Sequence, residues 1–288
     1  MKFLRRLSNG FFQKTFAFWQ GLGFHITPVH FYSPIPDTKK LSDALWQNHN
    51  LSTGIDFQEQ EQIEWLKMVA SRYQNEYEAL KKYPDNTEFG AVDSEILYSM
   101  VRWLKPKKMI EIGSGYSTII TAQALVRNEL ENEITCRYTV IDPYPKAFIQ
   151  QGFLGISSLV QKPVQEIPLK EFEDLDEGDI LFIDSSHVVK IGSDTQYEFL
   201  HILPKLKPGV IIHVHDIFLP SEYPKHWVLK EHRFFNEQYI LEALLFSQKF
   251  KVLWGSSFMH LFQSELLKKY ISSYQSTDWP GSFWMKKI

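Results

Sequence analysis

The sequence predicts an α/β protein, with a doubly wound and mostly parallel sheet preceded by a helical N-terminal extension. After residue 90, short β-branched runs alternate with helical patterns, whereas the chain before it is helical and irregular. The 288 residues are 44% hydrophobic and 23% charged, which is typical of a globular protein and excludes a disordered chain. We therefore expect a helical or lid region at 1–90 and an α/β domain at 91–288.

Residues 1–20, "MKFLRRLSNGFFQKTFAFWQ", combine basic and aromatic side chains. Polar residues interrupt the apolar stretch and no small-residue cleavage site follows, so we expect neither an export signal nor a spanning helix, and a cytoplasmic location. Such a segment packs on the main domain or a partner chain, or lies on an anionic membrane surface. The single cysteine, Cys136, fits a reducing compartment and is expected to be buried.

The region before residue 90 should contain one loop and one long helix. Residues 24–37 carry three prolines and cannot form a regular helix. From Glu59 to Leu80, apolar residues recur at helical spacing, until "YPDN" ends the pattern. A second helix follows, with Asp93 as its expected N-cap and Pro106 beyond its end.

The α/β domain should contain short strands separated by helical patterns. The expected strands are "MIEIG", "RYTVID", "SSLVQK", "DILFID", "GVIIHVHD", "FKVLWG" and the final "SFWMKKI", with helices at "STIITAQALVRNEL", "SDTQYEFLHILPKL" and 236–248. Glu111 lies within the first strand, and Asp142, Asp184 and Asp216 close three others. Ligands of such sheets bind at the carboxyl ends of the strands, although each aspartate could instead cap the next turn.

The turn "EIGSGYS" after the first strand indicates a nucleotide-like ligand, because glycines allow close approach of the backbone. The dinucleotide fingerprint G-x-G-x-x-G fits poorly, since Thr118 occupies the third position and the next strand-ending acid comes late. No G-K-[ST] follows, which excludes a P-loop. The net charge of −3 gives no indication of a nucleic-acid partner.

"EIGSGYS" resembles the E/D-x-G-x-G signature of class I S-adenosylmethionine (SAM) dependent methyltransferases, with Ser117 in place of a third glycine. The resemblance covers about residues 92–288 and implies a Rossmann-like sheet whose last strand, "GSFWMKKI", is antiparallel. "GDILFIDSSHVVKIGSD" and "LKPGVIIHVHDIFLP" look like a bacterial subgroup related to the metal-dependent catechol and macrolide-sugar O-methyltransferases. It implies O-methylation of a small molecule or glycan in bacterial biosynthesis.

The resemblance also implies the residues that bind SAM. Asp142 stands where the family places the acid that binds the ribose hydroxyls, Val164 is expected to pack on the adenine, and Gln165 to hydrogen-bond the adenine edge. The complete expected set is Glu111, Gly113, Ser114, Gly115, Tyr116, Ser117, Asp142, Val164, Gln165 and Asp184.

Methyl transfer to oxygen requires a positioned acceptor that can lose its proton, and either a histidine or a divalent metal ion can assist. The candidate catalytic residues are Asp184, His187, His215 and Asp216, and by the resemblance Asp184, His215 and Asp216 are candidate metal ligands. A histidine ligand suits Fe²⁺, Mn²⁺ or Zn²⁺ better than Mg²⁺. Without a metal, His187 or His215 takes the proton. We expect His213 and His215 to point to opposite faces of the sheet.

The acceptor side and the reaction itself leave alternatives open. Tyr32, Asp37, Tyr223 and Trp227 lie in aromatic, proline-bearing loops and are candidate acceptor contacts, or ordinary packing residues. A second copy of the chain is a further candidate partner. Rival hypotheses are an enzyme that cyclises or cleaves SAM itself, and a non-catalytic SAM-fold binding protein. A hydrolase is excluded because "DSSH" lacks the G-x-S-x-G elbow.

Overall fold

The computed structural model describes residues 11–12, 14–47, 54–77 and 89–288. Its contacts divide the chain into two units, residues 1–48 with 225–234 and residues 49–224 with 235–288. The boundary expected at residue 90 is therefore not the one that the contacts draw. The "YPDN" stretch and Leu80 lie outside the described residues.

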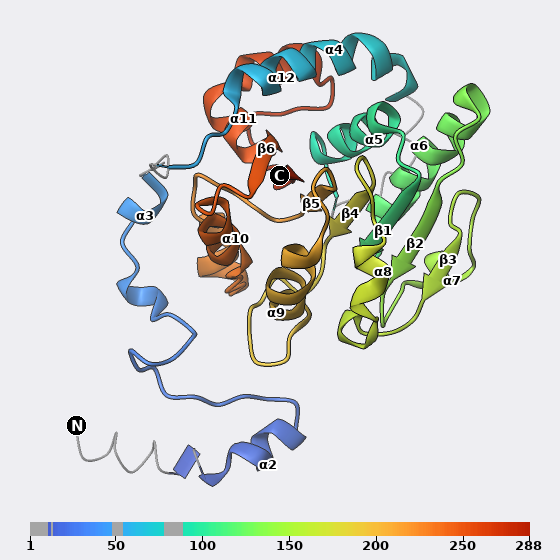
Figure 1. The fold of residues 1–288 in the computed structure, drawn as a ribbon. Helices are drawn as coiled ribbons and strands as arrows, with labels where there is room; N and C mark the ends of the chain where they lie inside the picture. The colour runs from blue at the N-terminus through green and yellow to red at the C-terminus, as the bar shows by residue number, and fades with distance from the viewer. Residues whose placement is uncertain (1–10, 13, 48–53, 78–88) are drawn as a thin grey trace. The chain divides into compact units, whose positions relative to one another are not determined.

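The smaller unit contains short helical segments joined by irregular chain (Figure 1). They are α2 (Phe16–Gly21), η1 (Thr38–Lys40), α3 (Ala44–Gln47) and the π-helical turn η6 (Trp227–Glu231). The proline-bearing residues 24–37 form no regular helix, as expected. Within the unit, Lys225 pairs with Asp43 at 2.8 Å and lies over the ring of Trp46.

The larger unit is a seven-stranded sheet covered by helices (Figure 1). Its strands are β1 (Lys108–Ile112), β2 (Arg137–Ile141), β3 (Ser158–Val160), β4 (Ile180–Ile183), β5 (Ile211–Val214), β6 (Phe250–Gly255) and β7 (Phe283–Lys287). The order is β3-β2-β1-β4-β5-β7-β6, in which only β7 runs antiparallel to its neighbours. All seven expected strands are confirmed, as is the antiparallel last strand.

The helices expected from the sequence are present, together with several short ones that were not expected. They are α4 (Glu59–Tyr77), α5 (Asp93–Leu104), α6 (Tyr116–Asn132), α7 (Ala147–Gln150), η3 (Val164–Glu166), α8 (Leu169–Glu173), α9 (Asp194–Tyr197) with its continuations η4 (Glu198–Ile202) and η5 (Leu203–Lys205), α10 (Glu237–Leu245), α11 (Ser256–Phe262) and α12 (Ser264–Tyr270). The pair α11 and α12 was not expected from the sequence. Helix α4 belongs to the larger unit, where it packs on α5, α12 and β6.

Side-chain alternation along β1 shows that helices cover both faces of the sheet. Glu111 contacts Ser117 and Thr118 of α6, whereas Ile110 faces a cavity that is also lined by Glu171 of α8. Strands β4 and β5 are buried along their whole length, because they lie in the middle of this layered arrangement. The carboxyl ends of β1, β2, β4 and β5 therefore meet at one edge of the core.

Candidate active site

The turn between β1 and α6 requires a glycine at its first bend. Gly113 has φ +84°, and a Cβ there would overlap the carbonyl oxygen of Asp184 and lie 2.8 Å from its carbonyl carbon. The Gly113 N–H donates to the carbonyl of Ile141 at 2.9 Å. Gly113 thus packs between the ends of β2 and β4, in a space that only a residue without a side chain can occupy.

The second glycine of the turn faces open space. Gly115 is extended, its N–H donates to Thr118 Oγ1 at 3.0 Å, and a Cβ built on it would meet no atom within 4 Å. It directly precedes the first turn of α6, where backbone N–H groups are available to a ligand. The protein's own packing does not require glycine at this position, whereas a ligand lying against the backbone would.

Glu111 stabilises the turn from inside the core. Its buried carboxylate accepts hydrogen bonds from Ser117 Oγ (2.7 Å), Thr118 Oγ1 (3.0 Å) and the Tyr138 hydroxyl. Burial raises the pKa of Glu111 to about 8, although the hydroxyls of Ser117 and Thr118 act in the opposite direction. Glu111 therefore fixes the loop and the start of α6, and in this conformation no solvent reaches it.

Asp142 lies just beyond β2 and beside the same turn. Its carboxylate accepts from Ser114 Oγ at 2.5 Å and from the Tyr144 N–H at 2.7 Å, and the residue is partly exposed. Tyr116, the first residue of α6, packs its ring against Phe148 at 5.8 Å. The two carboxylate oxygens of Asp142, which can accept hydrogen bonds, are thus held next to the open side of the glycine turn.

The segment after β3 contains the two residues expected at the adenine. Val164 is buried in η3, whereas Gln165 is exposed and donates from Nε2 to the carbonyl of Gly192 at 3.0 Å. This hydrogen bond connects the segment after β3 to the loop after β4. The amide oxygen of Gln165 accepts no hydrogen bond from the described residues.

Asp184, immediately after β4, belongs both to the turn and to an acid and histidine cluster. Its N–H donates to the carbonyl of Ile112 at 2.9 Å, and its carboxylate lies 3.4 Å from His187 Nε2 and 3.6 Å from His215 Nδ1. Burial alone would raise the pKa of Asp184, but the two histidines hold it below its ordinary value.

His187 lies among three carboxylates. Its Nε2 is 3.4 Å from both Asp184 and Asp216, and its Nδ1 contacts Glu237. Phe235 covers the ring at a centroid distance of 4.7 Å. Burial lowers the pKa of His187, but the surrounding carboxylates outweigh this effect and raise it well above the ordinary value, so the imidazolium form is favoured.

His215 completes the cluster from β5. Its Nδ1 lies 3.4 Å from Asp216, its Nε2 lies 3.6 Å from Asp93, and its ring stacks on Phe89 at 4.7 Å. Burial lowers its pKa, but Asp216 and Asp184 raise it well above the ordinary value. Asp216 has φ +56°, and burial raises its own pKa.

The expectation that His213 and His215 point to opposite faces is wrong, because residues i and i+2 of a strand share one face. The two rings lie 5.9 Å apart on the same side. His213 is fully buried against Phe182, contacts Ser282 Oγ at 3.0 Å, and has a pKa lowered by burial. It therefore belongs to the layer beneath the site.

Two acids of the cluster were not singled out from the sequence. Glu237 begins α10 and is fully buried, yet no motif surrounds it and 50 residues separate it from His187. Asp93 was expected to cap α5, but Val92 is the N-cap and the Asp93 carboxylate accepts from the N–H groups of Gly281 and Ser282. These two carboxylates differ from ordinary surface acids only in being buried, and burial can be seen only in the folded structure.

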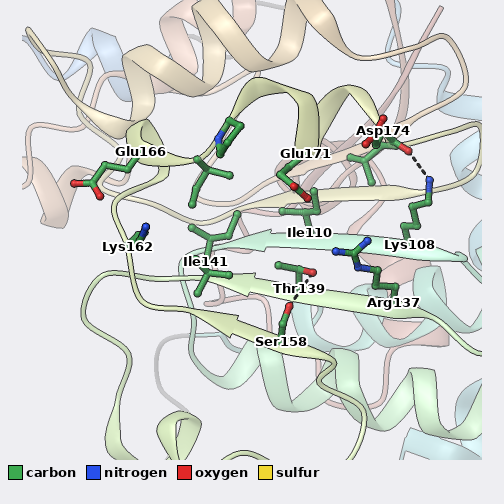
Figure 2. Close-up of a pocket in the computed structure, with 14 residues that line it drawn as sticks. Lys108, Ile110, Arg137, Thr139, Ile141, Ser158, Lys162, Glu166, Glu171 and Asp174 are labelled. Atoms are coloured by element: carbon green, nitrogen blue, oxygen red, sulfur yellow. Dashed lines mark hydrogen bonds between the residues drawn. The ribbon is translucent and has the colours of Figure 1, made fainter.

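A separate cavity of about 430 Å³ lies over β1, β2 and β3 beneath α8 (Figure 2). Ile110, Ile141 and Val160 contribute apolar surface, and Arg137 and Lys162 contribute charge. None of the expected site residues lines it. The cavity is therefore distinct from the acid and histidine cluster at the strand ends.

Residues 110–217 match the family model of a methyltransferase domain. This segment of the chain is similar to a methyltransferase domain. The matched range begins in β1 and ends just after Asp216, so it contains the glycine turn and the strand-end acids, and the sheet order with its antiparallel β7 is the one expected of the class I fold.

Known proteins that resemble this chain have low sequence identity to it. An uncharacterized protein of Archaeoglobus fulgidus is 29% identical over 171 residues, covering 52% of this chain and 74% of that one. The O-methyltransferase from Bacillus cereus solved with SAH is 14% identical with a TM-score of 0.41, covering 78% of this chain and 91% of that one. The TDP-rhamnose 3'-O-methyltransferase CalS11 of calicheamicin biosynthesis is 14% identical with a TM-score of 0.42, covering 80% and 95%. The fold assignment rests on the sheet order and the family match.

The glycine turn and the acid and histidine cluster differ in how their described residues fit SAM and a metal ion. The open Gly115 side and the neighbouring Asp142 carboxylate form a cradle that a Cβ would fill. In contrast, no group of three His, Cys, Asp or Glu side chains in the described part of the chain is arranged to hold a metal ion. Asp184, His215 and Asp216 do converge, but the histidine nitrogen faces the carboxylates as an ion-pair partner.

The four expected acceptor contacts are divided between the two units. Tyr32 is exposed, Asp37 caps η1 by accepting from the Lys39 N–H, and Trp227 lies beneath the Arg233 guanidinium, all within the smaller unit. Tyr223 is buried in the larger unit, where its hydroxyl accepts from the Gln238 N–H at 3.0 Å. Their role as acceptor contacts stays a prediction.

Proposed function

We propose that this protein is a methyltransferase that transfers the methyl group of SAM to a hydroxyl oxygen of a small-molecule or glycan acceptor. The observation that carries the proposal is the position of Asp184. Its backbone is hydrogen-bonded to β1 beside the glycine turn, and its carboxylate lies within 3.6 Å of two histidines. The cradle for the donor and the cluster able to handle a proton therefore share one residue.

The chain's own groups suit each part of the donor. Bound SAM supplies an electrophilic methyl group on a sulfonium centre. Gly115 leaves room for it against the backbone, Asp142 offers carboxylate oxygens to the ribose hydroxyls, and Val164 with Gln165 borders the adenine side. Glu111 acts indirectly, by fixing the hydroxyls of Ser117 and Thr118 under the turn.

Asp184 is the residue that we assign to the acceptor hydroxyl. Its side chain is 28% exposed, against 14% for Asp216 and 11% for His187, so it is the member of the cluster that an incoming ligand meets most readily. The lowered pKa keeps it ionised and able to accept the hydroxyl's hydrogen bond. His187 and His215 offset its charge and hold its orientation.

The cluster favours an oxygen acceptor, because a hydroxyl must lose a proton as it is methylated. The transfer breaks the sulfur–methyl bond, forms a carbon–oxygen bond, and passes the hydroxyl proton to a carboxylate of the cluster, since His187 already carries a proton. A network of this size is not needed for an acceptor without a proton to lose. We derive no step through a metal ion, since the described donor atoms do not form a ligand set.

The test measures SAH formed from SAM with a panel of hydroxylated sugars and phenols. Asp184→Asn should lower turnover by about 100-fold or more while SAM still binds, as expected when the carboxylate that accepts the hydrogen bond of the acceptor hydroxyl is lost. Asp176→Asn is the matched control, because Asp176 precedes the opposite end of β4 and is exposed. Methylthioadenosine formed from SAM alone would overturn the proposal in favour of a SAM-cleaving enzyme, and no turnover with any acceptor would favour a binding protein.

A further inference from the structure

The smaller unit carries an aromatic segment, residues 11–37, whose apolar side chains are not covered. Among the described residues, nine of the twenty-one exposed large hydrophobic side chains lie in this segment: Phe11, Phe16, Phe18, Leu22, Phe24, Val29, Phe31, Tyr32 and Ile35. Helix α2 within it buries none of its residues. Soluble proteins rarely expose so many large apolar side chains in one short stretch unless these side chains bind a partner or a membrane.

The rings of the aromatic segment contact mainly one another. Phe16 stacks on His25 at 5.3 Å, Phe18 packs edge-on to Trp19, and Phe31 contacts Tyr32 at 3.9 Å. These contacts leave Phe18 and Phe24 more than 60% exposed and Phe31 80% exposed. The segment therefore has no core of its own, in contrast to the larger unit.

Charge along the chain indicates the kind of surface that this segment fits. Residues 1–40 contain six basic side chains, Lys2, Arg5, Arg6, Lys14, Lys39 and Lys40, and one acidic side chain, Asp37. Their net charge is +5, which leaves −8 for the remaining residues of a chain whose net charge is −3. An anionic surface would attract the segment and repel the rest of the protein, and would therefore also orient it.

We propose that the aromatic segment docks on the surface of an anionic lipid bilayer. Aromatic side chains partition into the interfacial layer, and nearby lysines and arginines are attracted by anionic headgroups. The irregular spacing of the rings, interrupted by Pro28, Pro34 and Pro36, fits a fluid interface better than a protein groove, which requires periodic anchors. Among the described residues, none of the helices has the length and apolar character needed to span a membrane.

Sedimentation of the full-length protein with lipid vesicles tests the proposal. The protein should bind vesicles of equal parts phosphatidylcholine and phosphatidylglycerol, bind phosphatidylcholine alone at least tenfold more weakly, and be released as salt is raised. Phe18→Ser with Phe24→Ser should weaken binding to the anionic vesicles by about tenfold or more, because two interfacial rings are lost.

The matched control replaces two apolar residues of the larger unit that are even more exposed than Phe18 and Phe24, Leu130→Ser with Leu154→Ser, and should bind vesicles like the parent. An unchanged SAM affinity in both double variants would show that both are folded. Absence of vesicle binding, or equal weakening by both double variants, would overturn the proposal. If the parent instead forms a dimer and does not bind vesicles, and only the Phe18 and Phe24 double variant is monomeric, the segment would be assigned to contact between two copies of the chain.

Discussion

Alanine substitution at the two glycines of the turn should have opposite consequences, which tests the assignment of the donor cradle. At Gly113 a Cβ overlaps the Asp184 carbonyl, and φ is +84°. The left-handed backbone costs an L-residue ~1–2 kcal/mol and overpacking costs a further ~1–3 kcal/mol. Gly113→Ala should therefore lose about 2–5 kcal/mol of unfolding free energy, a large share of the ~5–15 kcal/mol typical of a domain.

At Gly115 a Cβ meets no protein atom and the backbone is extended. Gly115→Ala should thus change the free energy of unfolding by less than ~1 kcal/mol. A methyl group there would stand where SAM approaches the backbone, so the same overpacking cost of ~1–3 kcal/mol should fall on binding, about 5- to 150-fold in Kd.

Urea unfolding without ligand and calorimetric titration with SAM measure the two effects independently. Gly113→Ala should have a lower free energy of unfolding in urea. Gly115→Ala should unfold like the parent but bind SAM more weakly in the titration. Parental SAM affinity in Gly115→Ala would refute the placement of the donor at this turn. Parental stability in Gly113→Ala would refute the contact between the turn and the end of β4.

Three further predictions concern the donor acid, the buried glutamate and the metal. Asp142→Ala should raise the Kd for SAM by roughly 10- to 150-fold, because one or more hydrogen bonds to a charged group would be lost. A parental Kd in calorimetry would exclude Asp142 from the site. The pKa of Glu111 is raised from 4.5 to about 8 in the folded state, so the folded state binds the extra proton and stability should fall as pH rises between these values, by at most ~5 kcal/mol. Glu111→Gln should flatten this dependence in denaturant unfolding across that range, and an unchanged slope would contradict the assignment. Dialysis against a chelator should leave SAH formation unchanged within about twofold, because His187 and His215 already offset the charge of the Asp184 carboxylate. Loss of turnover that a divalent cation restores would show instead that Asp184, His215 and Asp216 rearrange around a metal.

Local patterns in the sequence were sufficient for the seven strands and for the glycine turn between β1 and α6. Strands such as "DILFID" are short, β-branched and bounded by turn residues, so their positions depend mainly on neighbours in the chain. Gly113 and Asp142 could likewise be placed, since a glycine turn after one strand and an acid after the next must meet at one edge of a parallel sheet. The error at His213 and His215 came from misapplied strand alternation, and the sequence alone could have corrected it.

Only the tertiary structure decided which side chains surround the chemistry. Glu237 reaches His187 across 50 residues, and Asp93 reaches Gly281 across 188, through packing of elements that no local pattern relates. Burial also determined roles: Glu111 was expected to face the ligand, but it is enclosed by hydroxyls beneath the turn. Segment 225–234 likewise groups with residues 1–48, from which it is far away in the sequence. Periodicity and turn chemistry are properties of adjacent residues, whereas charge pairing and desolvation arise from distant segments brought together by the fold.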